Sequence, residues 1–243
     1  MLEKIGDLFP DSYTRHARWY PCVLVSLPVA VLIATMAMFY IDVPGYELAK
    51  NIASIVLSVS FASGAAIKLL AGTIRDKGKK LEEREFKKRT AFPTTEFLLW
   101  SNNEFTDEYK HSIRNAIKED FGKILLDAEA ERTNEDYARK LIAEAVDVIR
   151  PRVKDGVRLL QYNIRYGFAR NLAAGSHDIG LPSALFCCFL ALCWLDNRAC
   201  VVLEGMLIVF YLWKVIKTEE NMKWYGEEYA RVMFAEYMES RTR

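Results

Sequence analysis

The feature that most constrains this fold is an uncharged apolar run at Pro21–Ile41, PCVLVSLPVAVLIATMAMFYI. A helix needs about 20 consecutive apolar residues to cross the hydrocarbon core of a bilayer, and this run is long enough. A second run, Ile52–Ile74, is also long enough and contains one lysine. Both runs predict transmembrane helices, because a helix satisfies its own backbone hydrogen bonds where lipid supplies no partners.

Two further apolar runs, Ile179–Leu195 and Ala199–Ile216, are slightly shorter than a bilayer requires. Only Asp196, Asn197 and Arg198 separate them, which predicts a tight helical hairpin. The hairpin lies either in the membrane or, alternatively, in the core of a soluble domain. We find no alternating strand pattern of any length. The sequence therefore predicts an all-α, polytopic membrane protein with about four transmembrane helices.

The distribution of charge indicates how these spans are oriented. The loops after the first and third spans carry no excess of basic residues, whereas residues 75–89 contain eight Lys/Arg and four Asp/Glu. The positive-inside rule then places 75–178 and both termini in the cytoplasm. The predicted parts are an N-terminal interfacial segment (1–20), transmembrane helices one and two (21–74), a cytoplasmic helical domain inserted between spans two and three (75–178), a transmembrane hairpin (179–216) and a C-terminal amphipathic helix (217–243).

Capping residues and helical spacing predict two helices in the cytoplasmic domain. Thr106 and Asn134 are residue types that cap helix N-termini, and the first helix runs to Gly122. Apolar residues recur four apart in each helix, at Tyr109, Ile113, Ile117 and Phe121 in the first and at Tyr137, Leu141, Ala145 and Ile149 in the second. We expect Pro151 to interrupt the second helix and a last helix to cover Arg152–Ala173. The C-terminal helix packs on this domain, on a neighbouring subunit or on the membrane surface.

Charge is also divided within the cytoplasmic domain. Residues 91–149 carry a net charge of −6, whereas 150–172 carry +5. Like charges four residues apart on a helix repel, so the basic segment needs acidic neighbours or an anionic ligand. Three interpretations stand: ion pairs with the acidic helices of 91–149, contact with lipid headgroups, or binding of a nucleotide or single-stranded DNA, in which arginine holds phosphate and tyrosine stacks on bases. The candidate ligand-binding residues are Arg150, Arg152, Lys154, Arg158, Tyr162, Arg165, Tyr166 and Arg170.

The second span is more polar than a lipid anchor requires. Its small and hydroxyl residues either let helices approach closely or line an aqueous path, and Lys68 either extends to the interface or forms a ring of charge at the inner mouth. Glu204, in the fourth span, is a functional candidate because ionisable groups are rare in membrane segments. It either pairs with Arg198 or faces a pore and favours cations. The candidate pore-lining residues are Asn51, Ser54, Ser58, Ala62, Ala65, Lys68 and Glu204.

We find no constellation of catalytic residues. The histidines at 16, 111 and 177 are isolated, and the chain contains no HExxH, Walker, GxGxxG or GxSxG motif. The five cysteines lie in or beside the apolar runs, without the spacing of metal sites or disulfides. We therefore expect no enzymatic activity, no metal and no cofactor.

In its organisation the chain resembles the small membrane effectors of bacterial antiphage defence, and is most similar to the transmembrane effector of the Hailong system. The resemblance rests on the polar second span, the basic segment Arg150–Arg170 and the run RYGFARNLAAG (165–175) that leads into span three. It implies a homo-oligomeric ion channel, a tetramer by preference, in a bacterial inner membrane. It also implies a cytoplasmic crown domain that binds DNA oligomers made by a partner nucleotidyltransferase, with the bound DNA holding the channel shut.

Together these features predict an oligomeric ligand-gated pore that acts as a defence effector. The nucleotide or single-stranded DNA signal binds the basic cytoplasmic surface. The alternative is a non-conducting membrane scaffold whose cytoplasmic helices dock a protein partner.

Overall fold

The computed structural model describes residues 12–40, 65–87 and 92–242. Every regular element in these ranges is a helix, as the sequence predicts. The chain packs as two compact units: unit 1 comprises Met1–Glu82 and Gly167–Glu220, and unit 2 comprises Glu83–Tyr166 and Asn221–Arg243. Three helices contain the boundaries between the units: α4 (Ala65–Lys87), α9 (Val157–Gly175) and α12 (Thr218–Ser240).

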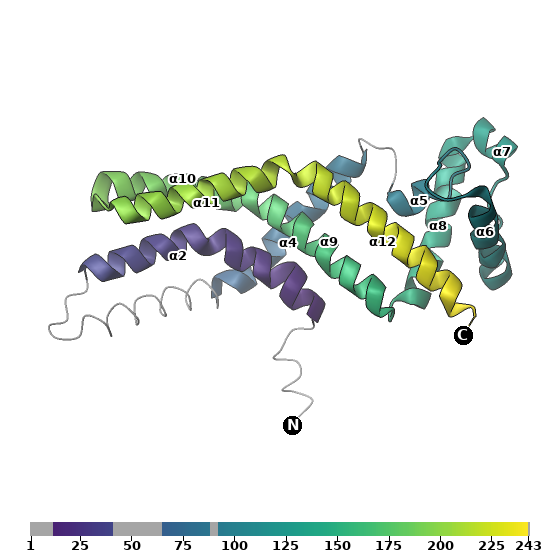
Figure 1. The fold of residues 1–243 in the computed structure, drawn as a ribbon, viewed down its shortest axis with the longest axis horizontal. Coiled ribbons are helices and arrows are strands. Elements are labelled where there is room, and N and C mark those ends of the chain that lie inside the picture. The colour runs from purple at the N-terminus through teal and green to yellow at the C-terminus, as the bar shows by residue number, and fades with distance from the viewer. Residues whose placement is uncertain (1–11, 41–64, 88–91, 243) are drawn as a thin grey trace, which may run out of the picture. The chain divides into compact units, whose positions relative to one another are not determined.

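Unit 1 contains the most apolar helices of the described chain. Besides parts of α4 and α9, its elements are η1 (Thr14–Trp19), α2 (Tyr20–Tyr40), η2 (Ser176–Gly180), α10 (Leu181–Leu190), η3 (Ala191–Leu195) and α11 (Arg198–Ile216), of which η1, η2 and η3 are π-helical. Helices α10 and α11 lie side by side (Figure 1), and α2 packs against both. Asp196 takes a left-handed conformation and the Asn197 side chain accepts the N–H of Cys200 at 2.9 Å, which together make the tight hairpin turn.

Three helical stretches of the described residues are long and apolar enough to cross a membrane. They are Thr14–Ala37, Val157–Leu195 and Arg198–Ile216, and they contain most of predicted spans one, three and four. The middle stretch is longer than its apolar run, because η2 joins α9 to α10 without interrupting the helix. The predicted second span lies mostly outside the described residues. These helices are typical of a membrane protein.

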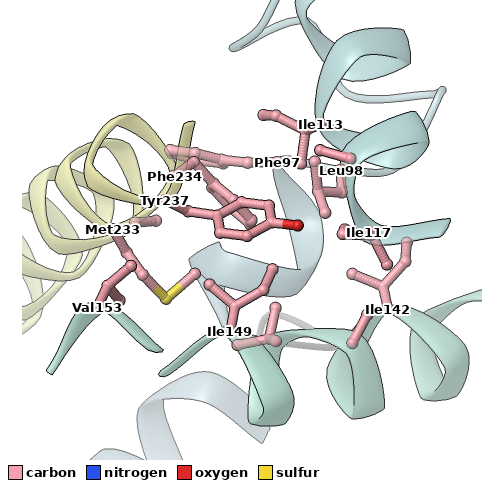
Figure 2. Close-up of a cluster of buried hydrophobic side chains, with 14 of the residues drawn as sticks. Phe97, Leu98, Ile113, Ile117, Ile142, Ile149, Val153, Met233, Phe234 and Tyr237 are labelled. Atoms are coloured by element: carbon pink, nitrogen blue, oxygen red, sulfur yellow. The ribbon is translucent and has the colours of Figure 1, made fainter. Parts of the chain in front are cut away.

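Unit 2 has an apolar core of its own, built from helices that are far apart in the sequence. Besides parts of α4, α9 and α12, its helices are α5 (Pro93–Glu96), α6 (Asp107–Phe121), α7 (Ala128–Thr133) and α8 (Glu135–Val153). Figure 2 shows this core, whose members include Phe97, Leu98, Ile113, Ile117, Ile142, Ile149, Val153, Met233, Phe234 and Tyr237. The C-terminal helix α12 therefore packs on the helices of 83–166, which is the first of the three positions considered for it.

The predicted helix starts in unit 2 are confirmed. Thr106 Oγ1 accepts the N–H of Tyr109 at 3.3 Å, and Asn134 Oδ1 accepts the N–H of Tyr137 at 3.1 Å. Each side chain satisfies a backbone donor that has no partner within its helix. Helix α6 ends at Gly122, whose φ of 66° lies in the left-handed region that glycine adopts at little energetic cost.

The prediction for the end of α8 is wrong. Pro151 does not interrupt this helix, which continues to Val153, and the next helix begins at Val157 instead of Arg152. Proline has no N–H to donate to the carbonyl four residues earlier, and the helix ends two residues after it. The turn of residues 154–156 separates the two helices, and this break changes which basic side chains share a face.

Candidate functional site

The basic residues of 150–170 do not form one continuous helical stripe. Arg150 lies on α8, Lys154 follows the end of that helix, and Arg158 lies on α9. The spacing of four residues therefore does not place these three side chains on one face. Arg158, Tyr162 and Arg165 do share a face of α9, and the Arg165 guanidinium lies 5.7 Å from the centre of the Tyr162 ring.

Four of the six basic residues have carboxylate partners. The pairs are Arg150–Asp147 (3.3 Å), Arg152–Asp120 (2.8 Å) and Arg158–Glu239 (2.6 Å) in unit 2, and Arg170–Glu82 (2.7 Å) in unit 1. Asp120 and Asp147 belong to the acidic helices of 91–149. The interpretation that the basic segment forms ion pairs with these helices therefore accounts for two of the pairs. Lys154 and Arg165 are exposed and make no ion pair with any residue that the structure describes.

A cleft of about 590 Å³ opens in unit 2 beside the start of α9. Its lining residues are Arg152, Val153, Asp155, Gly156, Val157, Arg158, Glu236, Glu239 and Ser240. The cleft thus combines two guanidinium groups with three carboxylates, and two of the predicted ligand-binding residues line it. An anionic ligand that enters this cleft has to replace at least one of the carboxylates as the partner of an arginine.

The Glu236 carboxylate already occupies the start of α9. Its Oε1 accepts the N–H of Leu159 at 3.3 Å and lies 3.6 Å from Nε of Arg158. A carboxylate is favourable there, because the first N–H groups of a helix have no partner within the helix and carry partial positive charge. Gly156 leaves room for it, since a Cβ at this position would lie 1.4 Å from Oε2 of Glu236.

Glu204 presents a different arrangement inside unit 1. It is fully buried on the side of α11 that also buries Tyr211, and neither of its carboxylate oxygens has a hydrogen-bond partner in the described part of the chain. The interpretation that it pairs with Arg198 is wrong for this structure, because Arg198 is exposed at the first residue of α11. The other cation of the helix, Lys214, lies 4.4 Å from the centre of the Trp213 ring.

All six of the other candidate pore-lining residues fall where the structure gives no side-chain positions. Outside the described residues lie Asn51, Ser54, Ser58 and Ala62. Ala65 and Lys68 lie at the beginning of α4, but their side chains are not described. The two interpretations of the second span therefore stay predictions.

Sequence reasoning missed the acidic side of the cleft. Glu236 and Glu239 lie in the C-terminal helix, about eighty residues from the start of α9, and nothing in their spacing indicates that they meet it. The only available signal was Gly156, because a glycine between two helices indicates a turn or a close approach. No group of three or more His, Cys, Asp or Glu suited to a metal ion occurs among the described side chains.

Comparisons with protein-family models, with curated proteins and with solved structures find no match for this chain. The resemblance to the Hailong effectors therefore stays a prediction.

Proposed function

We propose that the protein is a homo-oligomeric, ligand-gated pore of a bacterial inner membrane, in which unit 1 provides the membrane helices and unit 2 senses the ligand. The observation that carries this proposal is the fully buried Glu204 carboxyl without a described partner in an apolar helix. A helix that only anchors a protein gains nothing from such a group, which is expensive to bury. Ionisable residues in membrane segments are typical of ion and proton pathways.

The order of the helices along the chain supports coupling between the ligand site and the pore. Helix α9 continues through η2 into α10, and α12 follows α11 after Lys217. Two of the three helices that line the cleft in unit 2, α9 and α12, are therefore continuous along the chain with the two helices of the apolar hairpin. A ligand that changes the contact between α9 and α12 can bias the hairpin, but only by its differential affinity for the two arrangements.

The ligand we propose is anionic, either a nucleotide or a single-stranded DNA oligomer. Lys154 and Arg165 are available for phosphate without breaking a described ion pair, and Tyr162 offers a ring for stacking. Arg158 joins them when its contact with Glu239 is exchanged for the ligand. Arg170 is excluded from this set because it is paired with Glu82 and its side chain is only 11% exposed.

The proposal that the protein conducts is tested with purified protein in liposomes that hold a potassium gradient. We expect ion flux from the wild-type protein and a loss of about tenfold or more in the Glu204→Gln variant. The matched control is Glu220→Gln, because Glu220 is an exposed carboxylate just beyond the same helix. Wild-type protein that reconstitutes as an oligomer but never dissipates the gradient, with or without ligand, contradicts the pore.

Ligand binding is tested separately by fluorescence anisotropy of a labelled oligothymidylate. We expect the logarithm of the binding constant to fall linearly with the logarithm of the salt concentration. The slope should be about −0.7 for each phosphate contacted. Replacing both Lys154 and Arg165 with alanine is expected to reduce the affinity and this slope, whereas Arg170→Ala leaves the slope unchanged. Binding that is absent, or insensitive to salt, contradicts a phosphate ligand at this surface.

The second candidate function is a non-conducting membrane scaffold. It is favoured by the internal ion pairs of four of the six basic residues, which leave little unpaired positive charge for a nucleic acid. A scaffold predicts an intact oligomer without flux, and Glu204→Gln then has no conductance to remove.

A further inference from the structure

The environment of Glu204 indicates which ligand this carboxyl binds. We propose that Glu204 is a reversible proton-binding site, held as the neutral acid in the arrangement that the structure shows, and that release of its proton is coupled to conduction. The coupling rests on the proposed pore function, whereas the proton site rests on the geometry alone.

No cation lies against Glu204 from any described element. The elements that pack on α11 are α2, α10, η2 and η3, and their charged or titratable side chains in the described chain are Tyr20, Cys22, His177, Asp178, Cys187, Cys188 and Cys193. His177, the only basic group of this set, is mostly exposed and contacts Asp178, which also pairs with Lys77 at 2.6 Å. The groups close enough to Glu204 to interact with it electrostatically include Cys187, Cys200 and Tyr211, and their ordinary pKa values leave all three neutral at pH 7.

Three hydroxyl groups of α2 and α11 have acceptors other than Glu204. The Tyr211 hydroxyl donates to the carbonyl of Leu24 at 2.7 Å. On α2, the neighbouring helix, Ser26 and Thr35 each donate to a carbonyl of their own helix at 2.9 Å. An ionised carboxylate needs either a cation or several donors to offset its desolvation, and Glu204 has neither among the residues that the structure describes. The neutral acid avoids most of this desolvation cost, so a proton is the occupant that fits the site.

A second buried polar group without a described partner lies on a neighbouring element. Ser176 Oγ is fully buried on η2, which packs on α11. The approach of η2 to α11 is close because Gly180 has no side chain, and a Cβ there would lie 2.8 Å from the Tyr211 ring. The hydroxyl of Ser176 gives this part of unit 1 a group that can both donate and accept a hydrogen bond.

The proton site is tested with dicyclohexylcarbodiimide, an apolar reagent that adds to protonated carboxyl groups in apolar surroundings. The protein is treated in detergent across a pH series and digested, and the adduct is located by mass spectrometry. We expect an adduct on Glu204 whose rate falls about tenfold for each pH unit above the pKa of the group. Asp196 is the internal control, because this carboxyl of the hairpin turn is exposed, lacks apolar surroundings and should stay unlabelled.

The alternative occupants of the Glu204 site are sodium and potassium ions, which are added in the same labelling experiment. Protection of Glu204 by either ion at constant pH identifies a cation site and overturns the proposal, as does the absence of an adduct at any pH. The Glu204→Gln variant has to lose the adduct, which confirms the position of the label. Labelling of a protein that shows no flux in liposomes leaves the proton site standing and refutes only the pore, so the two failures are distinguishable.

Discussion

The two most deeply buried carboxyl groups of the described chain, Glu131 in unit 2 and Glu204 in unit 1, have opposite surroundings. Glu131 accepts the backbone N–H groups of Trp100 at 2.6 Å and Ser101 at 3.4 Å, and it pairs with Arg114 at 3.1 Å. Glu204 is buried at least as deeply and has none of these contacts among the described residues. The comparison shows that burial alone does not determine the state of a glutamate, because the groups within hydrogen-bond distance decide whether charge is tolerated.

The surroundings of Arg114 show how unit 2 compensates its buried charges. Besides Glu131, this guanidinium donates to the carbonyls of Leu126, at 2.6 Å, and Leu98. Burial lowers the pKa of Arg114 and outweighs the opposing effect of Glu131. The network joins α6 and α7 to the segment after α5, so it fixes loops that the apolar core alone leaves unspecified.

The largest expected change in stability comes from removing the carboxylate that compensates the buried Arg114 charge. Glu131→Ala leaves the Arg114 charge buried without its partner, and breaking a buried pair in this way typically destabilises a protein by about 3–5 kcal/mol. Thermal unfolding of the full chain in detergent measures it. Glu129→Ala, at an exposed position of the same helix, is the control and should lie within about 0.5 kcal/mol of the wild type. Equal effects of the two variants would contradict a stabilising role for the buried network.

A smaller effect is expected at the start of α9. Gly156→Ala places a Cβ against the Glu236 carboxylate, which has to move and give up the N–H of Leu159, so we expect a loss of about 1 kcal/mol. Adding Glu236→Ala removes the clash, so the double variant should be less destabilised than the sum of the single variants. Gly205→Ala is the control, because a Cβ there meets nothing within 4 Å. Additive effects in the double-mutant cycle would show that the carboxylate does not lie against Gly156.

Tyr237 allows a test by pH in unit 2. Burial raises its pKa, and so does its hydrogen bond to Asp120 at 3.0 Å. Because the pKa in the folded state exceeds the ordinary value of 10.0, this contribution to stability is complete below about pH 10 and is lost as the pH rises above it. Tyr237→Phe should lose about 1 kcal/mol at pH 8 and be less sensitive to alkali, as measured by melting temperature between pH 8 and pH 11. The same alkaline slope in both proteins would exclude Tyr237 as its source.

The sequence was sufficient for the parts of this fold that local chemistry determines. Thr106 and Asn134 cap the helices that their residue types predict, and three apolar runs correspond to the three long apolar helices. The apolar face of α8 was predicted less well. Ala145 and Ile149 are buried, but Tyr137 is 50% exposed, because the buried face is rotated towards Ala138 and Ile142.

The candidate sites depend on contacts between distant segments, which spacing along one helix does not reveal. The basic residues looked like one stripe, but the turn at 154–156 separates Arg150 from Arg158, and carboxylates from three other helices pair with half of the six basic residues. Glu204 could be singled out from the sequence because a carboxylate in an apolar run is rare. That it lacks a described partner depends on the neighbouring helices and required the structure.

The smallest change in stability is expected at Glu204, which makes the comparison with Glu131 sharpest. A neutral acid without hydrogen-bond partners loses nothing electrostatic when it becomes an amide of the same shape, so Glu204→Gln should change the free energy of unfolding by less than about 1 kcal/mol. Glu204→Leu should be neutral or stabilising, because an apolar side chain of similar volume avoids the desolvation of the carboxyl. The same thermal unfolding experiment measures both variants beside Glu131→Ala. A loss of about 3 kcal/mol or more in Glu204→Gln would mean that the carboxylate is ionised and held by a bound cation, in which case the two glutamates are compensated alike and the contrast between the units disappears.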